Sequence, residues 1–268
     1  MLPATFLAYA ALGCVAGLLA GALGLGGGVV IVPALLLTLP ALGLATDMAA
    51  HLAVATSLAT IAVTSLSAIR THHRHGYLRW PVALRLASGI VAGAFAGSLL
   101  ASGMPGAWLA SLFGLFAMLI ALQMAFASTP AATVAAPERL PGTTGLVLAG
   151  VLIGTVSGIF GIGGGSVTVP WLNWCRVRMQ EAVALSAAGG FPIALGGCSG
   201  FIITGWGQPG LPPGSVGYVY LPAAAAIMLT SFPFAWLGAR AAHRLPSRAL
   251  KRAFALVLFL IGLRLVLA

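Results

Sequence analysis

The sequence is poor in charge, and poorest of all in acidic residues. Charged side chains make up 6% of its 268 residues, and only three residues are Asp or Glu. A soluble domain carries about a quarter charged residues, so this chain has too few to cover a water-facing globule. Three scattered carboxylates also exclude a catalytic carboxylate pair, and neither a His-Glu zinc motif nor a Walker sequence is present. The sequence predicts no enzyme and no cofactor.

The remaining polar chemistry is not that of a metal site or a nucleic-acid binder. Cys14, Cys175 and Cys198 lie in or beside apolar segments without metal-ligand spacing, which is typical of buried small hydrophobes. The formal net charge is +10. However, the basic residues cluster in short loops between apolar runs, as the positive-inside rule expects of a membrane protein.

Long apolar runs dominate what is present, and they predict an all-α polytopic protein of the inner-membrane lipid bilayer. A linker at 128–142, rich in Pro, Ala and Thr, separates two groups of five runs. We expect residues 1–127 and 143–268 to be two transmembrane repeats. The ten predicted segments are 4–23, 28–44, 48–69, 82–101, 106–127, 143–160, 166–175, 181–203, 216–239 and 249–267.

The two halves are related in sequence, which indicates an internal duplication. Matching phrases occur in the same order in each half: GLGGG (24–28) and GIGGG (161–165), Pro33 and Pro170, and AVATS (53–57) and AVALS (182–186).

The basic loops fall at non-equivalent positions in the two halves. The loop 70–80 is basic and its counterpart 204–217 is uncharged, whereas 102–106 is uncharged and its counterpart 240–252 is basic. Since Lys and Arg remain on the cytoplasmic side, the second half is expected to lie upside down relative to the first. The prediction is a pair of inverted-topology repeats with both termini outside the cytoplasm.

Inversion requires an odd number of crossings in each half. The segment 166–175 would be roughly 15 Å long as a helix, against a hydrocarbon core of roughly 30 Å, so it cannot span alone. We therefore expect each repeat to be a Gly-tipped helix hairpin plus three spanning helices. Five full crossings per half would also satisfy the inversion.

The glycine phrases lie where one apolar segment ends and the next begins. Irregular backbone at membrane depth survives only where protein buries it or where it lines a polar cavity. New helices then start near Val29 and Ser166, and a helix N-terminus binds anions. Pro33 and Pro170 are expected to kink these short helices. Two such tips would form one anion site near the bilayer midplane; the alternative is that the glycines only permit tight helix packing.

Hydroxyl groups near the tips could donate to the same anion. Thr56, Ser57 and Ser186 follow the short helices, although membrane-embedded Ser and Thr often bond to their own helix backbone. Ser166 is the best placed, and an N-cap role there is compatible with ligand binding. The candidate substrate-binding residues are Gly24, Gly26, Gly27, Gly28, Thr56, Ser57, Gly161, Gly163, Gly164, Gly165, Ser166 and Ser186.

The paired phrases GLGGGVVIVPALL and GIGGGSVTVPWL, each followed by Ala-Val-Ala-x-Ser, resemble the sulfite exporter family of the TauE/SafE type, also called TSUP. The resemblance covers nearly the whole chain. It implies a secondary transporter with alternating access for a small sulfur oxyanion or organosulfonate, such as sulfite, thiosulfate or sulfoacetate. The chain departs from its own repeat at Leu185, which stands where the first half has Thr56.

Direction and coupling stay open at this stage. A negative-inside membrane potential favours export of an anion, and the alternatives are an uptake carrier or a membrane scaffold that transports nothing. Protons remain an option as coupling ion, and a homo-oligomer is an option too.

A few charged groups have simpler explanations than a site. Asp47 and His51 lie four apart on one helical face; a proton-coupling pair and an interfacial pair near the outer surface are the two alternatives. We expect Glu181 to mark the membrane interface beside Arg178. Arg264 is expected to snorkel to the outer surface.

Overall fold

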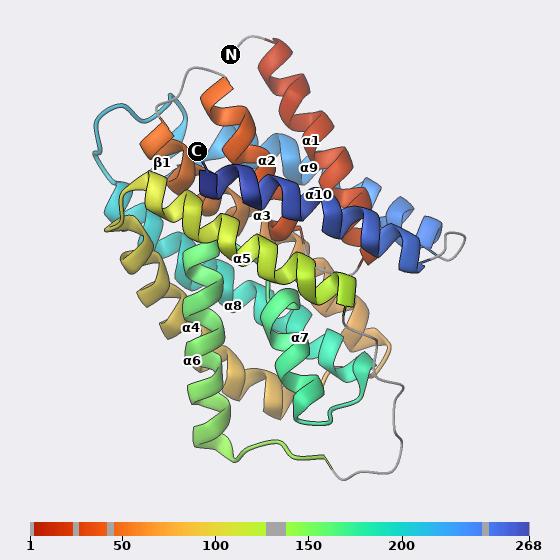
Figure 1. Cartoon of the computed structure of the whole chain (residues 1–268). Coiled ribbons are helices and arrows are strands. Elements are labelled where there is room, and N and C mark those ends of the chain that lie inside the picture. Colours follow the sequence, from red (N-terminus) through yellow and green to blue (C-terminus); the bar gives the residue numbers. More distant parts are fainter. Residues whose placement is uncertain (1–2, 24–26, 42–45, 127–137, 243–246, 268) are drawn as a thin grey trace.

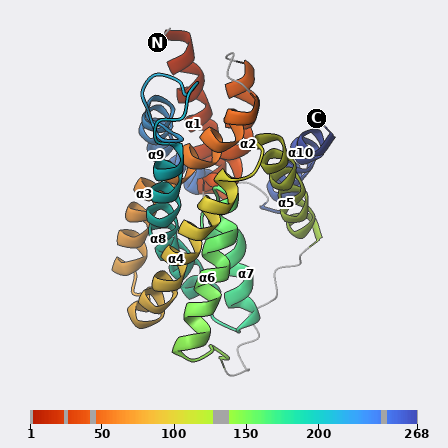
Figure 2. The ribbon, with the colours of Figure 1, turned by 90° about the vertical axis from the view of Figure 1, so that its left-hand side faces the viewer.

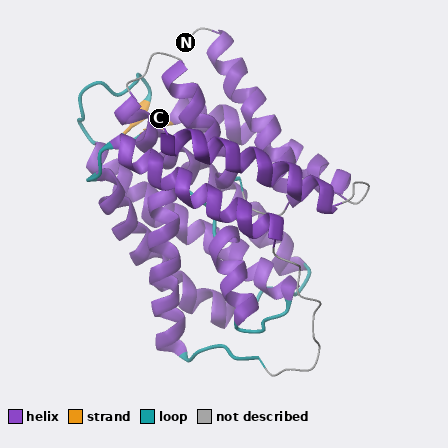
Figure 3. Cartoon of the chain, in the orientation of Figure 1, coloured by secondary structure: helices purple, strands orange, loops and turns teal. Residues whose placement is uncertain are grey.

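The described residues form a bundle of ten helices with one short β-hairpin (Figure 1, Figure 3). The computed structural model describes residues 3–23, 27–41, 46–126, 138–242 and 247–267. The first half holds α1 (Pro3–Leu23), α2 (Gly28–Ala41), α3 (Thr46–Arg74), α4 (Trp80–Ser102) and α5 (Gly106–Phe126). The second half holds α6 (Thr143–Phe160), α7 (Gly165–Trp174), α8 (Met179–Gly205), β1 (Ser215–Val216), β2 (Val219–Tyr220), α9 (Leu221–Ala242) and α10 (Ser247–Leu267).

The all-α polytopic prediction is confirmed. Each of the ten predicted segments corresponds to one helix, and the largest differences, five residues, occur at the end of α3 and the start of α9. Five helices, α3, α4, α5, α6 and α8, are long and apolar enough to cross a membrane. In lipid every backbone polar group needs an internal partner, and helices provide it within the segment.

One boundary was predicted wrongly. The segment expected to be helical from residue 216 begins instead with the antiparallel hairpin of β1 and β2, and α9 starts at Leu221. Gly214 and Gly217 adopt positive φ values of 87° and 54°, which favour a turn over a helix. The hairpin folds back into the protein, because Tyr218, Val219 and Tyr220 are all buried.

Glycines set the closest helix contacts. Gly89, Gly93 and Gly97 of α4 lie against backbone carbonyls of α6, so a Cβ atom at Gly93 would be 2.1 Å from the Val151 oxygen. The contact is reciprocal: a Cβ atom at Gly154 would be 2.3 Å from the Ile90 oxygen of α4. Small residues at such spacing let two helix backbones touch, which replaces hydrophobic burial as the source of packing energy in lipid.

The main helix contacts join the two halves. The most extensive contacts pair α4 with α6 and α1 with α9. In each of these pairs the fourth helix of one half packs on the first helix of the other half. The third helices, α3 and α8, pack on each other, and so do the fifth helices, α5 and α10. Each half therefore packs chiefly against the other.

Two helix hairpins enter the bundle from opposite ends (Figure 1, Figure 2). In the view of Figure 1, α1 descends from the upper end and α2 returns to it, whereas α6 rises from the lower end and α7 returns there. The loop that carries β1 and β2 lies at the upper end, and the loops around residues 75–79, 138–142 and 175–178 lie at the lower end. We call the lower end the basic end.

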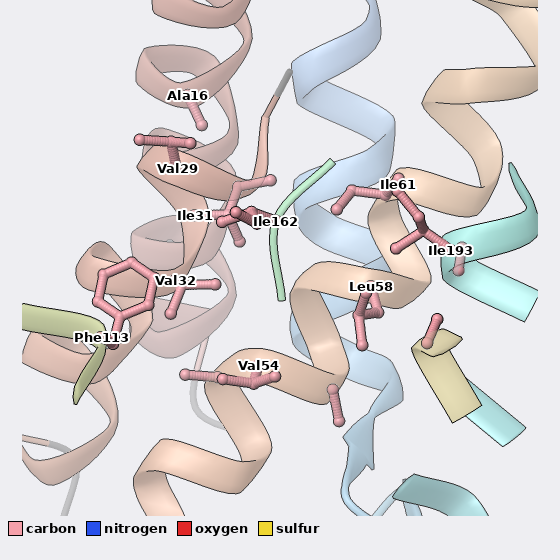
Figure 4. Packing of buried hydrophobic residues seen from close by; sticks show 14 of the residues in the cluster. Ala16, Val29, Ile31, Val32, Val54, Leu58, Ile61, Phe113, Ile162 and Ile193 are labelled. Atoms are coloured by element: carbon pink, nitrogen blue, oxygen red, sulfur yellow. The ribbon is translucent and has the colours of Figure 1, made fainter. Parts of the chain in front are cut away.

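The core lies where these hairpins meet α3. Figure 4 shows Ile31 of α2 beside Ile162, with Val54 and Leu58 of α3 below them. Ile162, Leu58 and the α2 residues Val32 and Leu35 are fully buried. This apolar packing positions the start of α2 and the bend between α6 and α7.

Candidate functional site

The bend between α6 and α7 is built on glycine. Gly161 ends α6 in the left-handed conformation, with φ at 66°, and its amide and that of Ile162 bond to the Ser157 carbonyl. A Cβ atom at Gly161 would lie 2.8 Å from the backbone oxygen of Val54 in α3. Only glycine meets both demands, since a left-handed φ and a close backbone approach each exclude a side chain.

The second glycine phrase lies directly against the first. A Cβ atom at Gly28, the first residue of α2, would be 2.6 Å from the Gly161 oxygen and 2.8 Å from the Ile162 Cα atom. The two predicted tips therefore contact each other through their backbones. Of the first phrase, Gly24 and Gly26 lie outside the described residues, so this contact is carried by Gly28. Gly27 lies one residue away and meets only the flexible end of Ile31.

The start of α7 carries a group of unpaired hydrogen-bond donors. Within the described residues, the backbone amides of Gly163, Gly164, Gly165 and Ser166 donate to no protein acceptor. The hydroxyl groups of Ser157, Ser166 and Thr168 are buried and also have no protein partner in this part of the chain. A buried polar group without a partner costs about 1–3 kcal/mol. The start of α7 therefore combines free backbone amides with the unpaired hydroxyls of its own residues Ser166 and Thr168.

The space around these donors is uneven. A Cβ atom at Gly163 would meet no atom of the described residues within 4 Å. A Cβ atom at Gly164 would lie 3.2 Å from the Thr168 hydroxyl and 3.4 Å from the Ser186 hydroxyl. The hydroxyls of Ser186 in α8 and Thr168 in α7 therefore both lie close to Gly164 at the α7 tip.

The two tips are unequal in polarity. At the start of α7 the side chains include Ser166 and Thr168, whereas the matching positions of α2 are Val29 and Ile31, both buried and apolar. The first tip therefore offers its backbone and an apolar wall, and the second tip offers hydroxyl donors.

Ser57 and Thr56 have structural partners. The Ser57 hydroxyl donates to the Gly161 carbonyl at 2.8 Å and so supports the bend. The Thr56 hydroxyl accepts a hydrogen bond from the Tyr220 amide at 3.1 Å, which ties β2 to α3. Both side chains are fully buried.

Sequence reasoning missed Ser157 and Thr168. Neither position is polar in the first half, because the residues that match them there are Ala20 and Ile31. The features that both repeats share therefore do not include these two hydroxyl groups. For Thr168, the available signal in the sequence was that SVTVP contains a second polar side chain within an otherwise apolar run.

The remaining predicted residues lie away from the tips. His51 is buried, 6% exposed, where it stacks on Tyr218 and bonds through Nε2 to the Ala101 oxygen. The Asp47 side chain lies outside the described part. Arg178 and Glu181 pair at the basic end, and Arg264 is exposed on α10. Among the described residues, no group of three His, Cys, Asp or Glu could hold a metal ion.

The known proteins to which this chain is similar are all described as transporters or exporters. The family model described as Sulfite exporter TauE/SafE matches residues 9–265. The chain is 35% identical to a probable membrane transporter protein of Haemophilus influenzae, over 95% of this chain and 96% of that protein. It is 27% identical to another from Methanocaldococcus jannaschii, over 95% and 93%, and 28% identical to YdhB of Bacillus subtilis, over 81% and 84%. No solved structure matches the chain.

Proposed function

Because the chain belongs to the sulfite exporter TauE/SafE family of membrane transporters, we propose that it is a secondary transporter that exports a small sulfur-containing anion across the inner membrane. Sulfite, thiosulfate, sulfoacetate and related sulfonates are the candidate substrates. The anion binds at the start of α7, where the two glycine phrases meet.

The observation that carries this proposal is the set of unpaired donors at that point. A sulfur oxyanion presents two or three oxygen acceptors at once, and the amides of Gly163 to Ser166 together with the hydroxyls of Ser166 and Thr168 supply that many donors. The positive end of the α7 dipole adds to the attraction. Away from water such hydrogen bonds strengthen, because the local dielectric constant is low.

The apolar side of the site suits the same substrates. The first tip carries the buried apolar side chains Val29 and Ile31 where the second tip carries hydroxyls, and a sulfonate has an organic end that suits an apolar surface. The anion would sit beside Gly163, where a Cβ atom would meet no atom of the described residues within 4 Å. The site therefore neutralises its ligand with backbone dipoles and hydroxyls, and it needs no cationic side chain.

Movement between the halves would expose this site to each side in turn. The helix contacts support two equivalent units, since α4 on α6 and α1 on α9 are matching pairs, and the two hairpins enter from opposite ends. Inverted repeats provide such exchange between outward-facing and inward-facing states. Since no nucleotide motif is present, the driving force is the substrate gradient or the membrane potential, and one negative charge leaving the cell gains about 2.3 kcal/mol per 100 mV.

Flux of radiolabelled sulfite into proteoliposomes tests the proposal. Thr168→Val keeps the shape of the side chain but removes a donor to a charged ligand, so we expect sulfite affinity to fall about 10-fold or more. Ser166→Ala should act in the same direction. Thr204→Val is the matched control, because the Thr204 hydroxyl bonds only to its own helix at Gly200.

Three results would argue against the proposal. Wild-type protein that moves no sulfite, thiosulfate or sulfoacetate would indicate a scaffold. Conductance without counterflow exchange would indicate a channel. Transport that survives both hydroxyl substitutions unchanged would exclude the α7 tip as the site.

A further inference from the structure

A separate feature, made of charged residues, lies at the basic end. It is distant from the proposed anion site at the start of α7, which we call the glycine site. A cavity of about 500 Å³ opens there, and the described residues that line it are all charged: Arg79, Glu138, Arg176, Arg178 and Glu181. We call these five residues the basic vestibule. They come from three separate parts of the chain, namely the α3–α4 loop, the segment before α6, and the α7–α8 loop with the first turn of α8.

Ion pairs occupy both carboxylates of the vestibule. Glu181, which is 12% exposed at its side chain, accepts from Arg178 at 2.5 Å through Oε1 and from Arg79 at 3.5 Å through Oε2. The Arg79 guanidinium also pairs with Glu138 at 2.5 Å. The cavity wall thus holds three arginines against two glutamates, and it keeps an excess of positive charge.

Arg176 is the arginine without an acid partner. Within the described residues its guanidinium makes no ion pair and no side-chain hydrogen bond. It nevertheless lines the cavity, next to the two paired arginines. An unneutralised cation in a concave site attracts small anions and raises their local concentration.

Arg176 occupies a backbone position at which glycine is normally favoured. Its φ is 62°, and it is the one non-glycine residue with positive φ in the described part of the chain. It follows α7 in a Schellman turn, in which the Val177 amide bonds to Leu172 and the Arg176 amide bonds to Asn173. Glycine is the favoured residue at that position because it takes a left-handed φ without strain. An arginine at a position that strains its own backbone indicates that its charged side chain has a function there.

The vestibule and the glycine site are joined by one short helix. The α7 helix starts at Gly165, in the glycine site, and ends at Trp174, two residues before Arg176. Ten residues of helix span roughly 15 Å. An anion held at Arg176 therefore lies about one helix length from the donors of Gly163 to Ser166.

From this arrangement we propose that the basic vestibule is a second anion-binding site, which collects the small sulfur oxyanion at the basic end before it moves to the α7 tip. The inference rests on the transport function proposed above. Arg176 is the residue that holds the anion. The two glutamates limit the net charge, so the anion binds weakly and leaves again.

Arg176→Gly separates this role from a structural one. Glycine relieves the left-handed backbone, so the variant should be at least as stable as the wild type, while its half-saturation concentration for sulfite should rise about fivefold. Turnover at saturating sulfite should stay unchanged. The experiment uses proteoliposomes of phosphatidylcholine alone and, in parallel, proteoliposomes that also contain phosphatidylglycerol, together with melting temperatures of the purified protein.

Two control variants accompany it. Arg176→Lys keeps the charge and should retain at least half of the wild-type affinity. Arg74→Gln removes an exposed basic side chain near the same end but outside the cavity, and it should change affinity less than twofold. Raising the salt concentration should reduce the difference between wild type and Arg176→Gly, because ions screen the charge of Arg176.

The outcomes distinguish this inference from the transport function. Sulfite transport with equal affinity in wild type and Arg176→Gly would overturn the vestibule but leave the transporter intact. If wild type moved no sulfite, the vestibule would still be supported by sulfate raising the melting temperature of wild type and not of Arg176→Gly. An effect of the variant found only in vesicles with phosphatidylglycerol would assign the oxyanion to a lipid headgroup and overturn the substrate role.

Discussion

The hydroxyl of Ser57 donates a 2.8 Å hydrogen bond to the carbonyl oxygen of Gly161 and so joins the middle of α3 to the bend between α6 and α7. The two residues are 104 positions apart and come from different halves of the chain. Both groups are buried, so no water replaces the bond if it is lost. The bend that presents the α7 tip is therefore held by a side chain of the first half.

Ser57→Ala should destabilise the protein by about 1–3 kcal/mol, because it leaves the Gly161 carbonyl without a partner. Thermal unfolding in detergent measures this loss. Ser199→Ala is the control, since the Ser199 hydroxyl only bonds to Gly196 of its own helix. If Ser57→Ala were as stable as Ser199→Ala but bound sulfite more weakly, Ser57 would be a ligand residue and not a support of the bend.

Gly28→Ala should abolish transport, because its methyl group would overlap the Gly161 oxygen at 2.6 Å. Neither backbone can move away easily, since α3 presses on Gly161 from the other side. Gly27→Ala is the neighbouring control. There the nearest atom is the flexible Cδ1 of Ile31 at 3.1 Å, so the variant should remain active. Sulfite flux and melting temperature are measured together, and equal behaviour of the two variants would contradict the close contact of the two tips.

The helix boundaries could be predicted because apolar runs and polar loops alternate so regularly. The start of α9 could not. Val216 to Tyr220 continue the apolar run of the helix, and only the glycines at 214 and 217 hint at a hairpin. Hydrophobicity reports burial, and a buried strand and a buried helix can have the same composition.

Only those parts of the site that occur in both halves of the chain could be predicted from the sequence. The repeated glycine phrase indicated where two bends lie, and Gly28 does meet Gly161. Ser157 and Thr168 were missed because they have no polar counterpart in the first half. The partners of Thr56 and Ser57 were also beyond reach, since both bonds join residues more than 100 positions apart.

Gly93→Ala should prevent stable assembly of α4 on α6. The added methyl group would lie 2.1 Å from the Val151 oxygen of α6. The α6 backbone also contacts α4 closely through its own glycines, so it has no room to move away. Overpacking of a tight interface typically costs about 1–3 kcal/mol, and here backbone rather than side chain must move. Gly103→Ala serves as the control, because its nearest contacts are at 3.7 Å. The yield of monodisperse protein and its melting temperature are the measurements; a Gly93→Ala protein as stable as Gly103→Ala would contradict the contact.

Thr56→Val should loosen the β-hairpin. The substitution removes the acceptor of the Tyr220 amide and leaves that buried N–H unpaired, at a cost of about 1–3 kcal/mol. Hydrogen exchange of the Tyr220 amide should accelerate. Thr56→Ser keeps the hydroxyl and should restore slow exchange. If Thr56→Val left the exchange rate unchanged and weakened sulfite binding instead, the hydroxyl would serve the ligand, as the sequence suggested.

Short epitope tags inserted after His75 and after Gly210 should report from opposite sides of the membrane. The α3–α4 loop and the loop before β1, which hold these two positions, lie at opposite ends of the bundle in Figure 1. The loop near His75 carries Arg70, Arg74 and Arg79, whereas residues 204–217 carry no charge, so the positive-inside rule assigns the first to the cytoplasm. In intact spheroplasts an antibody should reach the tag after Gly210, and it should reach the tag after His75 only once the membrane is permeabilised. Each tagged protein must still transport sulfite, which shows that the insertion has not changed the topology. Accessibility of both tags from the same side would mean that the second half is not inverted, and the basic vestibule would then need a new assignment to one face of the membrane.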